Sequence, residues 1–139
     1  MIYTGNEILS HMFAVLKDSD LVKKKIGGKL YKRGTRPLDS AAEDAVIGFL
    51  SGTATQVQEG FVVLNVYVPN LKTKAGATMC NIARCQAIEK LLVNIPDLLT
   101  AQGNVKFETS DMICTLDEPD INQHFVSLKM RFKVFSSKN

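Results

Sequence analysis

The sequence contains no apolar run long enough to cross a membrane. Its clearest run, FVVL at residues 61–64, is strand-sized, whereas a membrane-spanning helix needs about 20 apolar residues. The first residues, MIYTGNEILSHMF, also lack the basic stretch and the apolar core of a secretory signal peptide. We therefore expect a soluble protein without membrane contact, located in the cytoplasm of its host cell.

Histidine and cysteine, on which many catalytic and metal sites depend, are scarce. His11 falls in a predicted helix and His124 at the start of a predicted strand, so a catalytic triad has few possible members. Cys80, Cys85 and Cys114 are odd in number and form no CxxC pair, which favours reduced thiols. Two alternatives remain open: a Cys–His nucleophile pair, and a zinc site whose ligands come from separate elements. Both rank below the interpretation that the cysteines are a core thiol and a partly exposed thiol.

Loop motifs that bind nucleotides or calcium are also missing from the sequence. The glycines at 27–28 lead into a strand, and no G-x-G-x-x-G or G-x-x-x-x-G-K-[ST] occurs. The acidic residues of 117–120 are interrupted by Pro119 and lack EF-hand spacing. We therefore expect no catalytic residues, no cofactor and no metal, and a protein that is not an enzyme.

Length and charge define the broad class. The chain has 139 residues, of which 45% are hydrophobic, which is enough for one core, so we expect 1–139 to form a single domain. Its 17 Lys and Arg against 14 Asp and Glu give a net charge of +3, too low for a protein that coats nucleic acid. Nucleic acid is therefore not the expected partner.

Two segments have helical periodicity. Thr4 and Glu7 have capping-box spacing and predict a helix over residues 5–17. Further along, apolar residues recur in steps of three or four and predict a long helix with one buried face: Ile82, Cys85, Ile88, Leu92, Ile95 and Leu99. Pro96 is expected to kink this helix or to begin a new turn, and Gly103 to end it.

The other patterned segments are predicted to be strands, and residues 29–33, 61–68 and 125–135 show the period of two that is typical of strands. The predicted strands are residues 29–33, 44–51, 61–68, 105–115 and 125–135. Residues 23–28 and 36–40 are expected to be loops, and residues 117–120 a turn. The order α-β-β-β-α-β-β lacks regular βαβ alternation, so it predicts an α+β fold, an antiparallel sheet with two main helices on one face.

The last predicted strand has one apolar side and one basic side. Lys129, Arg131 and Lys133 alternate with apolar residues and therefore share a face. This face could lie in solvent, contact another protein or contact phosphates, although no aromatic platform for bases interleaves the charges. For the protein-contact interpretation, the candidate interaction residues are Tyr31, Arg33, Arg36, Lys129, Arg131 and Lys133.

One part of the sequence resembles a known group of proteins. Residues 28–47 read GKLYKRGTRPLDSAAEDAVI and residues 65–70 read NVYVPN. These stretches resemble the small phage and prophage proteins of the tail-terminator and head-to-tail joining group, in particular prophage proteins of Bacteroides-type gut bacteria. In that group a leading helix precedes a strand of the form G-x-hydrophobic-Tyr, an Arg-Pro turn, further strands, one long helix and a final strand pair.

The resemblance spans nearly the whole chain in element order, while its residue motifs cover about a fifth of it. It implies a structural virion protein without catalytic residues, which forms a ring, commonly a hexamer, at the end of a tail tube or at the neck. Its implied partners are its own copies and other tail or neck proteins. The alternatives are a small cytoplasmic ligand-binding or nucleic-acid-binding module, and an enzyme of unknown type.

Overall fold

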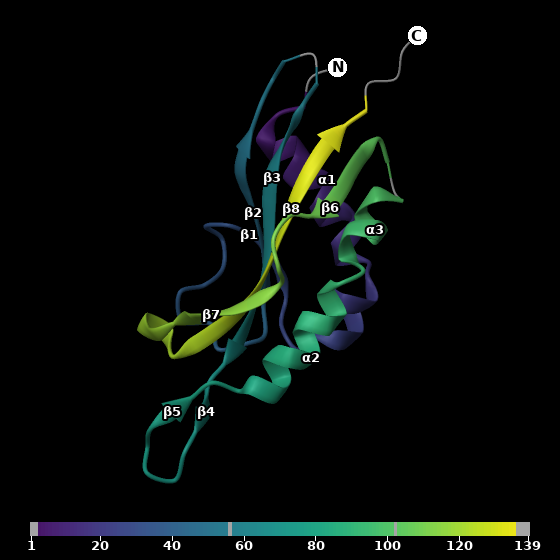
Figure 1. Ribbon diagram of the computed structural model, residues 1–139. Coiled ribbons are helices and arrows are strands. Elements are labelled where there is room, and N and C mark those ends of the chain that lie inside the picture. Colours follow the sequence, from purple (N-terminus) through teal and green to yellow (C-terminus); the bar gives the residue numbers. More distant parts are fainter. Residues whose placement is uncertain (1–2, 56, 102, 136–139) are drawn as a thin grey trace.

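The structure is a computed structural model that describes residues 3–55, 57–101 and 103–135 (Figure 1). The helices are α1 (Gly5–Lys17), α2 (Ile82–Leu92) and α3 (Ile95–Thr100), with a π-helical turn η1 (Leu21–Lys25) and a 3-10 turn η2 (Pro119–Ile121). The strands are β1 (Leu30–Lys32), β2 (Ala45–Gly52), β3 (Glu59–Pro69), β4 (Leu71–Lys72), β5 (Thr78–Met79), β6 (Val105–Thr109), β7 (Cys114–Glu118) and β8 (Gln123–Val134).

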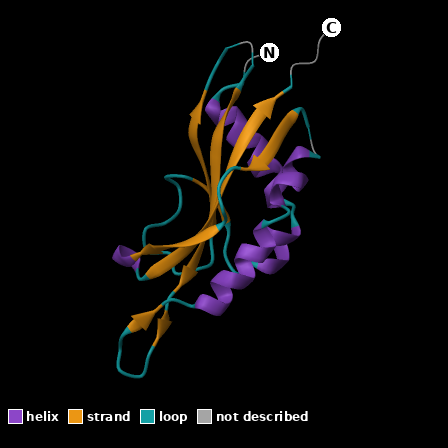
Figure 2. Ribbon diagram, viewed as in Figure 1, coloured by secondary structure: helices purple, strands orange, loops and turns teal. Residues whose placement is uncertain are grey.

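The main sheet confirms the predicted α+β class. Its strand order is β1-β2-β3-β8-β6, with β7 also paired to β8, and α1, α2 and α3 lie on one side of it (Figure 2). The sheet is mostly antiparallel, as predicted, and the one exception is that β1 runs parallel to β2, which makes it a mixed sheet. A parallel neighbour requires a crossover connection, and residues 33–44 supply it here.

The core lies between the sheet and the helices. Val62, Leu64 and Val66 of β3 are fully buried, as the alternating pattern predicts. Buried residues from the other elements pack around them: Ile8, Met12, Leu16, Cys85, Ile88, Leu92, Ile95, Leu99, Leu128 and Met130. The predicted helical stripe is therefore confirmed with one correction, because Ile82 at its start is 72% exposed.

Helix α1 occupies the residues that its sequence signal predicts. The amide of Glu7 donates to Thr4 Oγ1 at 3.3 Å, and the amide of Thr4 donates to Glu7 Oε1 at 2.9 Å, which completes the capping box. The second helical segment divides in two, since α2 ends at Leu92 and α3 begins at Ile95 with Pro96 in its first turn. None of the helices within the described residues is long and apolar enough to span a membrane.

The predicted strand over residues 105–115 is two strands. Both lie along the same edge of β8, β6 beside Met130–Val134 and β7 beside Gln123–Ser127. Residues 110–113 belong to neither strand, although the Ser110 amide still donates to the Lys129 carbonyl of β8 at 2.9 Å. The acidic turn also begins later than predicted, since Asp117 and Glu118 belong to β7.

Two elements were not predicted from the sequence. The lysines of residues 23–25, predicted to be a loop, lie in η1, where the Ile26 amide donates to the Leu21 carbonyl at 3.0 Å. The small hairpin β4–β5 forms a separate two-stranded sheet. Its polar and small residues carry no clear alternation, so their strand pairing had no signal to reveal it.

Candidate assembly surface

Residues 33–44 lie against the sheet face opposite the helices. The Arg33 guanidinium lies over Gly48 of β2, where an added Cβ would approach Arg33 Nε to 2.8 Å. Arg36 stacks on the Tyr67 ring of β3, with its Cζ 4.1 Å from the ring centroid. This long connection is therefore fastened to the sheet by two of the candidate interaction residues.

Arg36 is held by a buried polar network. Its Nε donates to Asp44 Oδ2 at 2.9 Å, and only 9% of the Arg36 side chain and 2% of the Asp44 side chain are exposed. Further Arg36 donors reach the Ser40 and Ala42 carbonyls and the Gln123 side chain at 2.9 to 3.3 Å. The guanidinium is thus occupied within its own chain and presents little surface to a neighbour.

The electrostatics of Asp44 follow from its contacts. Burial acts to raise the pKa of this carboxyl, but hydrogen bonds from the Ser40 hydroxyl, the Lys29 amide and Arg36 outweigh burial and lower it. Gly28 allows this close approach, because an added Cβ there would collide with Asp44 Oδ1 and the Glu43 carbonyl. The conspicuous residues of 28–47 therefore have a structural role: their hydrogen bonds and close packing hold this segment in place.

A second ion pair supports the same segment. Arg84 of α2 donates to both oxygens of Glu43, at 2.7 and 2.8 Å, and to the Lys25 carbonyl at 2.6 Å. The hydrogen bond from Arg84 lowers the pKa of Glu43, and the same contact raises the pKa of Arg84. This pair ties the crossover connection to α2.

The basic stripe of β8 is partly neutralised within the chain. Lys129 lies 3.5 Å from Asp111 and above the Phe61 ring, and Arg131 donates to Glu59 at 2.8 Å. Glu108 is a further partner of Arg131 at 3.9 Å. Lys133 is exposed and forms no ion pair among the residues that the structure describes.

The six candidate interaction residues do not form one patch. Tyr31 is a half-buried residue of β1, and Arg33 and Arg36 follow it on the connection to β2. Strands β2 and β3 separate this edge from β8, which carries Lys129, Arg131 and Lys133. A single flat interface using all six would have to cover most of one sheet face.

The hairpin β4–β5 projects from the body of the molecule (Figure 1). Leu71 and Met79 pair across it and are 48% and 53% exposed. Its turn is closed by the Thr73 amide, which donates to the Ala77 carbonyl at 2.8 Å, while Gly76 takes a φ of +83° that glycine tolerates. A two-stranded hairpin is only marginally stable alone in water, so contact with a surface that covers this hairpin would stabilise it.

The base of the hairpin is joined to the start of β8. The Asn70 amide donates to the Asn122 carbonyl at 3.1 Å, and Asn70 Oδ1 lies 2.7 Å from His124 Nδ1. Asn122 follows η2 and takes a left-handed conformation, with a φ of 54°. These contacts bring the hairpin and the acidic segment of β7 and η2 to one end of the molecule.

The outer edge of β7 is open. Within the described residues β7 pairs only with β8, and α2 reaches it through Glu89, which accepts a hydrogen bond from the Thr115 hydroxyl at 2.8 Å. Leu116 is 45% exposed, and Met112, just before the strand, is 88% exposed. An unpaired edge flanked by exposed apolar side chains is a typical place for another chain to bind.

Two of the three cysteines pack against each other at the start of α2. Cys80 Sγ and Cys85 Sγ lie 4.0 Å apart, before and within the first turns of α2, in the positions of a hydrophobic staple. Burial first, and the Cys80 thiol second, raise the pKa of Cys85 to about 11. Among described residues, the ring of His11 stacks on Phe107, while His124 contacts Asn70 and Asp117. The described part of the chain contains no group of three potential metal ligands.

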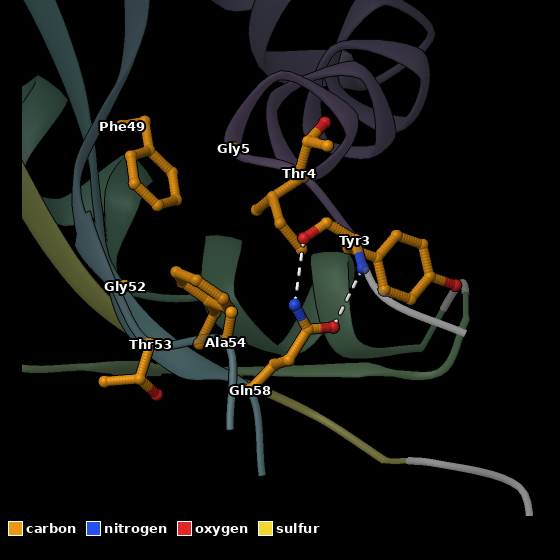
Figure 3. Close-up of a pocket in the computed structure, with 10 residues that line it drawn as sticks. Tyr3, Thr4, Gly5, Phe49, Gly52, Thr53, Ala54 and Gln58 are labelled. Carbon is orange, nitrogen blue, oxygen red and sulfur yellow. Dashed lines mark hydrogen bonds between the residues drawn. The ribbon is translucent and has the colours of Figure 1, made fainter. Parts of the chain in front are cut away.

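An apolar pocket of about 310 Å³ lies where α1 begins, beside the end of the β2–β3 pair (Figure 3). Tyr3, Phe49 and Phe132 line it. Two of its polar residues bond to each other: the Tyr3 amide donates to Gln58 Oε1, and Gln58 Nε2 donates to the Tyr3 carbonyl, both at 2.9 Å. A ligand here would find apolar contact and few free hydrogen-bonding groups.

Comparison with known proteins does not assign the chain to a family. No protein-family model matches the chain, and no curated protein matches its sequence.

Proposed function

We propose that the protein is a structural subunit that acts by assembly, forming a ring-type homo-oligomer as a tail-terminator or neck component of a phage or prophage particle. Its partners are then its own copies and adjoining tail or neck proteins, and its location is the virion. The observation that carries the proposal is the hairpin β4–β5, which holds Leu71 and Met79 half-exposed outside the core.

The arrangement of the rest of the chain supports an assembly role. The long connection at residues 33–44 is anchored to the body of the molecule by the buried Arg36–Asp44 ion pair and by hydrogen bonds of Arg36. The hairpin and the unpaired edge of β7 are different surfaces on one molecule. Two different surfaces that bind each other generate a head-to-tail interface, which closes into a ring when the rotation between copies permits.

Association through the hairpin predicts a defect when its apolar pair is removed. Leu71→Ser with Met79→Ser should weaken self-association at least about tenfold, because burying each side chain contributes on the order of 1 kcal/mol. The matched control is Leu38→Ser with Leu50→Ser, which removes two exposed leucines away from the hairpin, 92% and 43% exposed. Size-exclusion chromatography with light scattering measures both.

The melting temperature of each variant should stay close to that of the wild type, since neither pair belongs to the buried core. Equal association by the hairpin variant and the wild type would contradict the proposed role of the hairpin. A loss in the control variant alone would move the interface to the β2 side of the sheet.

A further inference from the structure

We infer that the partner of the hairpin is the acidic edge of a second copy: the hairpin β4–β5 of one molecule docks along β7 and η2 of the next. This inference rests on the proposed self-assembly and names the surfaces that carry it. It goes beyond the predicted stripe on β8, which plays no part in this contact.

The charged side chains of the hairpin are all basic. Residues 70–79 contain Lys72 and Lys74 and no acidic residue, and both lysines are exposed. Neither forms an ion pair with any residue that the structure describes, whereas Lys129 and Arg131 of β8 have acidic partners. The hairpin therefore presents two positive charges that are free to meet a negative surface.

The segment formed by β7 and η2 has the opposite charge. Asp117, Glu118 and Asp120 lie within four consecutive positions, and Asp117 and Asp120 are exposed. Over the described residues the ion-pair partner of this group is His124, 3.5 Å from Asp117, which carries charge only when protonated. Within the part of the chain that the structure describes, the acidic charges are therefore largely uncompensated.

The apolar residues of the two surfaces also match. Leu71 and Met79 occupy one cross-strand position of the hairpin, and Leu116 and Met112 are exposed along the edge that includes β7. Apolar contact supplies affinity, while the surrounding charges align the surfaces and speed their encounter. Both halves of a contact are thus present on every copy.

The hairpin and the acidic residues of β7 and η2 do not pair with each other within one molecule. Asn70 fixes the base of the hairpin beside Asn122, but the hairpin then extends away from the body (Figure 1). Accordingly, neither Lys72 nor Lys74 forms an ion pair with the acidic residues of β7 and η2. The complementary surface is available to the hairpin on a neighbouring copy.

A charge exchange tests the contact directly. Lys72→Glu with Lys74→Glu, and separately Asp117→Lys with Asp120→Lys, should each raise the dissociation constant of self-association at least about tenfold at low salt. Combining all four substitutions restores opposite charges across the contact and leaves the net charge at +3, because two gains offset two losses. The combined variant should assemble within about threefold of the wild type.

The control is Lys106→Glu with Lys133→Glu, which reverses two exposed lysines on β6 and β8 and should leave assembly unchanged. If circular dichroism shows that replacing Asp117, which lies beside His124, disturbs folding, Asp120→Lys alone replaces the double variant. Failure of the combined variant to regain assembly, or loss of assembly only in the control, would overturn the inference while self-assembly itself stands. A wild-type chain that never associates would overturn both.

Discussion

Ile88→Asp is expected to unfold the protein. Ile88 lies in α2 with no exposed surface, packed in the core between the helices and the sheet. The substitution removes apolar contacts and places a carboxylate where the surrounding core side chains are apolar. A cost above about 4 kcal/mol is a large part of the 5 to 15 kcal/mol that stabilises a typical domain.

The measurement is thermal unfolding followed by circular dichroism, with Ala87→Asp as the matched control. Ala87 is the preceding residue of the same helix and is exposed, so its replacement should cost only the helix propensity of Asp, about 0.7 kcal/mol. An Ile88→Asp variant with the melting temperature of the control would show that this face of α2 does not face the core.

Arg36→Ala should cost about 3 kcal/mol of unfolding free energy, because it leaves the buried Asp44 carboxylate without its cation. Asp44 keeps its hydrogen bonds from Ser40 and Lys29, which limits the loss. Arg84→Ala breaks the more exposed pair with Glu43 and should cost about 1 kcal/mol. Urea unfolding of both variants at pH 7 compares the two pairs.

The pH dependence of the Arg36→Ala effect follows from the lowered pKa of Asp44. The stabilisation linked to this carboxyl is present above its ordinary pKa of 3.8 and is lost as the pH falls through the lower folded-state value. The difference between wild type and variant should therefore narrow below about pH 4. A difference that stays constant from pH 7 to about pH 2 would show that the ion pair is not its source.

Local signals predicted much of the fold. The capping box of Thr4 and Glu7 defines α1, and the alternation of β3 separates its buried and outer residues, because helices and strands have distinct periods. The parallel placement of β1 and the break after Thr109 were not predictable in this way. Both depend on which strand lies alongside, and pairing is set by contacts distant in the sequence.

The proposed interaction surface was harder to predict from the sequence than the fold. Arg36 is conspicuous beside Pro37, but its partners include Gln123, far along the chain, so its burial was not apparent. Lys129 and Arg131 formed a clear stripe, while their acidic partners come from other segments. The sequence does contain one signal that was not used: residues 70–79 include Lys72 and Lys74 but no acidic residue, so these charges have no partner nearby in the sequence.

Self-assembly of the wild-type chain is the central claim, and sedimentation velocity over a concentration series tests it most directly. From about 1 μM to about 1 mM at low salt, we expect monomer to give way to one closed oligomer whose sedimentation coefficient then stays constant. A closed ring stops growing because each copy uses its hairpin and its β7 edge once. A chain that sediments as a monomer even at about 1 mM would contradict the account.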